Sequence, residues 1–265
     1  MEIDILEWIN LAFRWIHIFA GIMWVGATFF FTWLDGRFAE LSGTETEKNV
    51  WMVHSGGFYV VVKQKSPHIV PDKLHWFRWE AAITWLSGIV LLGYLYYFGG
   101  LMTEDLNNEP TAMAAGIAAI VLAWPLYDLL WKSPLARDER VAGAISFVLI
   151  VAAAYVLDTF MGPRAAYIHV GAMLGTLMTA NVWMVIIPAQ RKMVAALAPG
   201  ATPDERLAAR AKGRSKHNTF MVLPVVFLMI SNHFPTITFG TPSRLLVLAS
   251  MVLVGWGAAK IIRRA

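Results

Sequence analysis

The stretch "FRWIHIFAGIMWVG", residues 13–26, is apolar enough for the interior of a lipid bilayer, yet it contains Arg14 and His17. It lies inside a longer apolar run, residues 8–34. A membrane-spanning α-helix needs about 20 predominantly apolar residues, so this run predicts a transmembrane helix. Ionisable side chains at membrane depth are costly and usually serve a function. Arg14 and His17 are therefore the first candidate site residues.

The composition of the whole chain is that of a membrane protein. Apolar residues make up 57% of the 265 residues, charged residues make up 15%, and the mean hydropathy is +0.55, whereas a soluble domain has about 25% charged residues. The sequence has no cysteine, which excludes disulfides, thiolate metal sites and a covalent c-type haem, since that needs C-x-x-C-H. The net charge of +4 comes from basic residues between the apolar runs and does not indicate nucleic-acid binding. We expect one integral membrane domain over residues 1–265.

The apolar runs predict an all-α, polytopic membrane bundle of about seven transmembrane helices. Lys and Arg are concentrated in the loops 35–77, 131–140 and 188–217 and in the C-terminal tail, and each intervening loop contains one or none. Since short basic loops stay in the cytoplasm, we expect the N-terminus outside and the C-terminus in the cytoplasm, in a bacterial inner membrane. The predicted spans are residues 8–34, 78–99, 112–131, 141–161, 165–187, 218–232 and 244–262.

Two of the predicted cytoplasmic loops, 35–77 and 188–217, contain structural signals. In "NVWMVHSGGFYVVVKQ" (49–64), two β-branched and aromatic runs flank Ser-Gly-Gly, which predicts a β-hairpin. A re-entrant segment is the alternative, because backbone at membrane depth is tolerated where protein covers it. In "TPDERLAARAKGR" (202–214), Thr, Pro and Glu stand where a capping box begins a helix, so a short surface helix is expected there.

The seven histidines fall into two layers on this topology. His17, His169 and His233 lie towards the outer side. His75 and His217 precede spans on the cytoplasmic side, and His54 and His68 lie in the cytoplasmic loop. The segments "RWIHIFAGIM" (14–23) and "AYIHVGAMLG" (166–175) share an aromatic-Ile-His motif followed by Gly and Met. This weak repeat suggests a parallel internal duplication.

Two neutral imidazoles on separate helices are suited to the axial positions of haem b. We expect His17 and His169 to be the axial ligands, with His233 as the substitute, and Arg14 to pair with a haem propionate. The alternative is that Arg14 extends to the outer interface while the histidines hydrogen-bond neighbouring helices.

Several polar side chains gather at the cytoplasmic side of the predicted bundle. The charged ones could bind an anion, or they could be orientation anchors of the kind that basic residues often provide. They are Lys63, His75, Arg78, Glu80, His217 and Asn218, with His54 in the neighbouring loop.

Four blocks of the sequence resemble the bacterial membrane-bound urate oxidase family: "HSGGFYVVVKQ" (54–64), "LHWFRWEAAITWLSG" (74–88), "WPLYDLLWKSPL" (124–135) and "HNTFMVLPVVFLMISNHFP" (217–235). The resemblance implies oxidation of urate to 5-hydroxyisourate, with electrons passed to cytochrome c. It also implies a membrane domain followed by a further span and a cytochrome c domain. This sequence lacks C-x-x-C-H, so we expect a separate acceptor, a shortened chain or a relative with another substrate.

For a urate-like anionic purine, the residues suggest definite roles. Arg78 would supply a planar pair of donors, Lys63 a point charge, and Asn218 and His217 hydrogen bonds to the purine edge. His75, Glu80 and His54 are the candidate catalytic proton acceptors. A b-type cytochrome without purine oxidation and a transporter remain the alternatives, and an oligomer is compatible with each.

Overall fold

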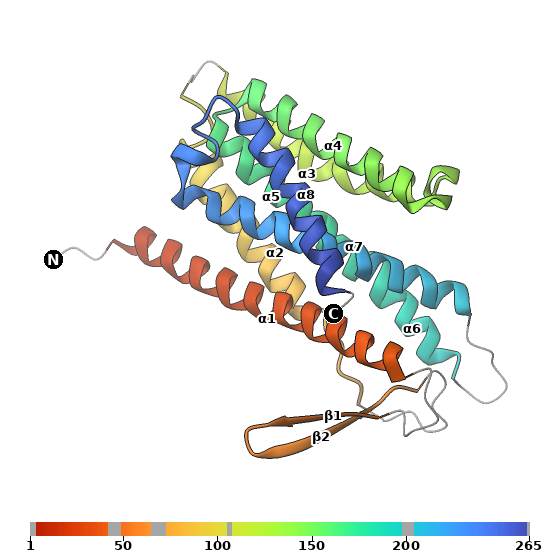
Figure 1. Cartoon of the computed structure of the whole chain (residues 1–265). Helices are drawn as coiled ribbons and strands as arrows, with labels where there is room; N and C mark the ends of the chain where they lie inside the picture. Colours follow the sequence, from red (N-terminus) through yellow and green to blue (C-terminus); the bar gives the residue numbers. More distant parts are fainter. Residues whose placement is uncertain (1–3, 42–48, 65–72, 105–107, 198–203, 264–265) are drawn as a thin grey trace.

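The computed structural model describes residues 4–41, 49–64, 73–104, 108–197 and 204–263, and nearly all of them are helical (Figure 1). The all-α fold that the apolar runs predict is therefore confirmed. The helices are α1 (Ile5–Leu41), α2 (Trp79–Leu92), α3 (Glu109–Lys132), α4 (Glu139–Phe160), α5 (Pro163–Ala180), α6 (Ile187–Ala195), α7 (Glu205–Ile230) and α8 (Arg244–Ile262).

Short helical segments of other types extend or connect these helices. A π-helical segment, η1 (Gly93–Tyr97), extends α2, and another, η3 (Asn181–Ile186), joins α5 to α6. The 3₁₀ turns are η2 (Pro134–Arg137), η4 (Ser231–His233) and η5 (Pro235–Ile237). Pro188 explains the position of η3, because the ring of a proline inside a helix clashes with the carbonyl of residue i−4, here Met184. A π-helical turn relieves such a clash and frequently marks a functional site.

Among the described residues, six helical segments are long and apolar enough to cross a membrane: Ile5–Leu41, Trp79–Tyr97, Glu109–Lys132, Glu139–Phe160, Pro163–Ala195 and Arg244–Ile262. The sequence predicts one more span, residues 218–232. This stretch comprises the second half of α7 and the start of the 3₁₀ turn η4, which follows α7 directly. The first half of α7 is rich in Arg and Lys, so the helix as a whole is not apolar.

The predicted short surface helix at 202–214 is wrong as a separate element. The chain continues from it into the apolar half of α7 without a break, because a single glycine such as Gly213 costs a helix only about 1 kcal/mol. Asp204 is the N-cap, and its carboxylate accepts a hydrogen bond from the Arg206 amide. The residues 202 and 203 of the predicted capping box lie outside the described part of the chain.

The predicted β-hairpin is confirmed. Strands β1 (Asn49–His54) and β2 (Gly57–Val62) are antiparallel, with pairs from Asn49↔Val62 to His54↔Gly57. Ser55 and Gly56 have φ values of 50° and 77°, as a two-residue hairpin turn requires. The hairpin lies beside the C-terminal half of α1 (Figure 1). We call this end of the bundle, where α1, α3 and α6 end, the hairpin end; the opposite one is the N-terminal end.

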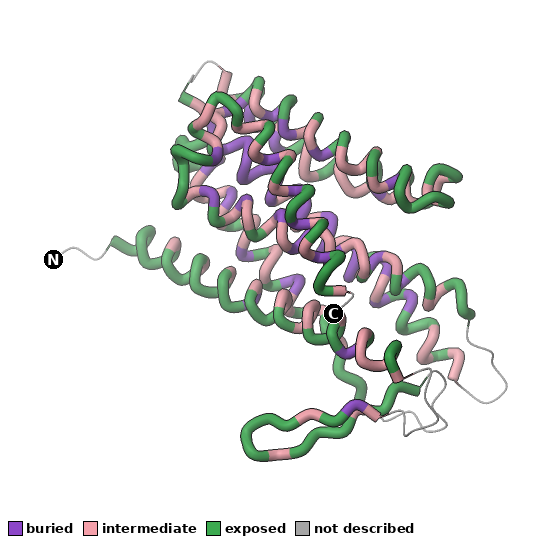
Figure 2. The backbone as a smooth tube through the Cα atoms, in the orientation of Figure 1, coloured by how far each residue is buried: buried purple, intermediate pink, exposed green. Residues whose placement is uncertain are grey.

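Helix α5 forms the centre of the bundle and α1 its edge. Most α5 side chains are buried among α2, α3, α4 and α7, whereas the described part of α1 buries only Ala20 and Leu34 and packs mainly on α2 (Figure 2). Exposed apolar residues elsewhere on α1 are what a lipid-facing helix requires. The functional side chains are therefore to be sought around α5 and its continuation η3.

Candidate functional site

A buried network of polar side chains joins three helical segments near the hairpin end. Tyr127 comes from α3, Asn181 from the first position of η3, and His217 and Asn218 from α7. The Tyr127 hydroxyl bonds Nδ1 of His217 at 2.6 Å. The Asn181 amide donates to the Tyr127 hydroxyl at 3.1 Å and to Oδ1 of Asn218 at 2.9 Å. Asn218 in turn donates to the backbone carbonyl of Met178 at 3.0 Å.

A buried ion pair borders this network. Arg214, one turn before Asn218 on α7, is 4% exposed and contacts Asp128 of α3 at 2.6 Å. Lys132 also pairs with Asp128. The Arg214 guanidinium lies over the Tyr127 ring, 4.6 Å from its centroid. A buried charge persists only when it is paired, so this pair fixes α7 against α3.

Three buried polar atoms of this region have no hydrogen-bond partner in the described part of the chain. They are Oδ1 of Asn181, Nη1 of Arg214 and Nε1 of Trp131, whose ring contacts His217 at a centroid distance of 3.9 Å and a tilt of 46°. Leaving such a group unsatisfied costs about 1–3 kcal/mol. One acceptor and two donors in one network suit a planar ligand that carries both carbonyl and N–H groups.

His217 stands one residue before the apolar half of α7 and is the titratable group of the network. Burial and, less strongly, the nearby Arg214 cation lower its pKa to about 4. The imidazole is therefore neutral at pH 7. Its Nδ1 accepts the hydrogen bond of the Tyr127 hydroxyl, so the proton of the neutral ring is on Nε2 and Nδ1 is its one basic nitrogen.

A second polar group surrounds the start of α2. The Arg78 guanidinium lies between the Trp79 and Trp183 rings, at 5.5 and 5.4 Å from their centroids. Nε2 of His75 is 3.9 Å from Oε1 of Glu80. Within the described residues, Nε of Arg78 and Oε2 of Glu80 are buried without partners. His75 is largely exposed beside a hollow of about 240 Å³ that Gln190 also lines.

The structure divides the predicted cytoplasmic cluster into three groups. His217 and Asn218 belong to the buried network, and His75, Arg78 and Glu80 form the group at α2. Lys63 pairs with Asp35 of α1, and His54 bonds the hydroxyl of Ser55 in the hairpin turn at 2.8 Å. No contact within the described ranges links Lys63 or His54 to the other two groups.

His17 and His169 both lie towards the N-terminal end of the bundle, on separate helices. Nδ1 of His17 donates to the Thr84 carbonyl of α2 at 2.8 Å, and the ring packs on Gly88. Nδ1 of His169 donates to the Ala165 carbonyl at 2.8 Å. Both Nε2 atoms are thereby left as electron-pair donors, the form in which histidine binds a metal.

Other features of the two histidines bear on haem binding. Nε2 of His169 accepts a hydrogen bond from Tyr97 at 3.2 Å, and no contact between described residues joins the two rings. If Nε2 of His169 binds haem iron, the Tyr97 hydroxyl must therefore move away from this nitrogen. Among the described residues, no three His, Asp or Glu side chains lie close enough together to hold a metal ion. An Nε2 electron pair on each histidine is the donor that haem iron takes, and the exposed His233 in η4 lies at the same end.

Two arginines near the histidines are suited to an acidic group. Nε of Arg14 donates to Asn10 at 2.9 Å, and Nε of Arg164 donates to Asn232 at 2.8 Å. Neither contacts a carboxylate among the described side chains. Arg164 and, less strongly, Arg14 both lie within electrostatic range of Tyr96. The two propionates of a haem would supply one negative charge for each arginine.

The membrane-length helices, with a buried polar network between α3, η3 and α7, define a polytopic helical membrane protein. The family described as "Urate oxidase N-terminal" matches residues 3–263. The chain belongs to this family, as its four sequence blocks predict. No curated protein and no solved structure matches the chain.

Proposed function

We propose that this chain is the membrane domain of an oxidoreductase that converts urate to 5-hydroxyisourate and passes the electrons through haem to a cytochrome c-type acceptor. Family membership supports urate as the substrate class. The observation that carries the proposal is the set of three unpartnered atoms on Asn181, Arg214 and Trp131.

Urate is a planar anion with carbonyl oxygens and N–H groups. Nη1 of Arg214 and Nε1 of Trp131 would donate to its oxygens, and Oδ1 of Asn181 would accept from an N–H group. Arg214 would also offset the negative charge, since charge-assisted hydrogen bonds are roughly twice as strong as neutral ones. The aromatic rings of Tyr127 and Trp131 suit a flat ligand.

Urate and water give 5-hydroxyisourate, two electrons and two protons, so the site needs a proton acceptor. The Tyr127–His217 pair would take one proton, with Nδ1 of His217 receiving the Tyr127 hydroxyl proton as Tyr127 receives one from the substrate. His75 and Glu80 lie at the same end of the bundle, and His75 is exposed. They would release protons to the solvent, and Arg78 beside them would attract the anionic substrate.

Haem b, held by His17 and His169 with Arg14 at a propionate, would accept the electrons one at a time. The basic residues of the hairpin end support an orientation with that end on the cytoplasmic side of a bacterial inner membrane. The N-terminal end would then face the outer side, where a cytochrome c-type acceptor could collect the electrons.

Urate binding to the purified protein under anaerobic conditions tests the proposal. Trp131→Phe keeps a ring against His217 but removes the unpartnered N–H donor. Loss of one hydrogen bond to a charged ligand costs about 1.5–3 kcal/mol, so affinity by titration calorimetry should fall about tenfold or more. Trp124→Phe, on the same helix, is the control and should bind as the wild type does. Equal affinity of Trp131→Phe and the wild type would refute this site.

A further inference from the structure

One face of the β-hairpin is exposed and apolar except for Asn49, the cross-strand partner of Val62. Cross-strand partners point to the same side of a two-stranded sheet, so the pairs Trp51↔Val60 and Val53↔Phe58 share this face with Val62. Their exposed fractions run from 44% for Val60 to 80% for Phe58. We call these five residues the outer hairpin face.

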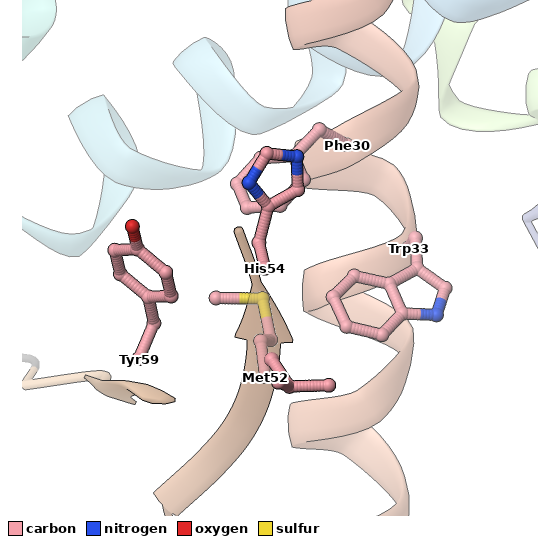
Figure 3. Close-up of a pocket in the computed structure, with 6 residues that line it drawn as sticks. Phe30, Trp33, Met52, His54 and Tyr59 are labelled. Carbon is pink, nitrogen blue, oxygen red and sulfur yellow. The ribbon is translucent and has the colours of Figure 1, made fainter. Parts of the chain in front are cut away.

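The other face of the hairpin is turned towards α1. It carries Val50, which is 6% exposed, and Met52. Met52, His54 and Tyr59 line a hollow of about 470 Å³ together with Phe30 and Trp33 of α1, and Val53 of the outer hairpin face contributes to its rim while remaining 69% exposed (Figure 3). The hairpin thus has one side directed at its own helix and one side without a partner in the described part of the chain.

The position of the hairpin along α1 sets its depth. Phe30 and Trp33 belong to the last turns of the apolar run 8–34, and the polar residues Asp35 and Arg37 follow directly. Because the hollow joins the turn residue His54 to Phe30 and Trp33, the hairpin turn lies beside the boundary between apolar and polar parts of α1. That boundary is where a membrane surface would meet the helix.

We infer that the outer hairpin face is inserted into the membrane interface at the hairpin end, at the level of the lipid headgroups and first acyl carbons. Trp and Phe with aliphatic neighbours are the composition of an interfacial anchor. The sequence from Lys48 to Lys65 contains three lysines and no acidic residue, which complements anionic lipids.

The backbone limits how deep the hairpin lies. The described sheet has two strands, so each strand has an open edge with unpaired N–H and C=O groups. Such edges do not occur in the hydrocarbon interior, because lipid chains offer no hydrogen bonds. The headgroup region satisfies both requirements, with apolar contact for the side chains and water for the edges.

Spin labelling tests this insertion directly, because the chain has no cysteine and single-cysteine variants label at one position. The probe is a nitroxide at Phe58→Cys or Trp51→Cys, in nanodiscs that contain anionic phospholipid. Power saturation compares its accessibility to oxygen, which concentrates in lipid, with its accessibility to a water-soluble nickel chelate. Leu149→Cys on the exposed face of α4 is the deep control, and Glu205→Cys at the start of α7 is the aqueous control.

We expect oxygen-to-nickel ratios at positions 58 and 51 several-fold above the aqueous control and below the deep control. Met52→Cys, on the opposite face, should be poorly accessible to both reagents. A ratio at both outer positions equal to the aqueous control would overturn the inference, because the face would then be in water. Low accessibility to both reagents there would also overturn it, because protein, such as a second copy of this chain, would then cover the face.

Discussion

Removal of the Asp128 carboxylate should lower the free energy of unfolding more than removal of an exposed carboxylate that also pairs with α7. Asp128→Ala leaves Arg214, whose side chain is 5% exposed, without its ion-pair partner at 2.6 Å. It also deprives Lys132 of the same partner. Breaking a buried pair by removing one side costs about 3–5 kcal/mol, and we expect this loss in the free energy of unfolding.

Glu139→Ala provides the matched control. Glu139 also joins α7 to a neighbouring helix, through Lys216 at 2.6 Å, but its side chain is 61% exposed. An exposed pair contributes about 0–1 kcal/mol. Unfolding of both variants by denaturant in the same detergent, followed by circular dichroism, measures the difference. If Asp128→Ala loses no more stability than Glu139→Ala, the buried pair does not hold α7 against α3 as described.

Three further predictions concern packing and charge. Gly255→Ala places a methyl group 2.7 Å from a proline ring of α7 and should lower the unfolding free energy by about 1–3 kcal/mol, whereas Gly257→Ala, with open space around it, should not. Gly116→Ala puts a Cβ 2.8 Å from the ring of His169, and we expect reduced haem absorbance in the purified variant. Because the pKa of His217 is lowered to about 4 from an ordinary 6.5, the unfolded chain binds more protons than the folded one between these values. Stability should therefore fall as the pH drops from about 6.5 to 4, and a His217→Gln variant should lack this part of the pH dependence.

The sequence predicts most of the fold because lipid and backbone impose strong local rules. Apolar runs of membrane length mark the helices, and alternation around Ser-Gly-Gly at 55–57 marks the hairpin. The junction within α7 is not predictable in this way. Its basic first half and apolar second half differ in composition, and composition is what separates segments in sequence analysis. Continuity of the helix depends on backbone hydrogen bonds that composition does not record.

The candidate site is predictable only in part, since depth in the membrane can be derived from sequence while helix rotation cannot. The sequence groups His217 and Asn218 with Arg78, but the structure turns His217 towards Tyr127 of α3 and Asn218 towards Asn181 and Met178. In the sequence, Arg214 stands in a basic loop and looks like an orientation anchor, as Arg78 does. The structure shows instead that its side chain is buried against Asp128. Tyr127 lies within the block 124–135 that carries the family resemblance, and this was the one signal that could have identified it.

The central claim is that urate delivers electrons to haem within this chain. An anaerobic titration of the oxidised, purified protein with urate, followed by visible absorption, tests it most directly. We expect urate alone to produce the sharp absorption band of reduced b-type haem, and this response to be weaker in Trp131→Phe than in Trp124→Phe. A haem band that dithionite reduces but urate does not, or a protein that shows no haem band at all, would contradict the account.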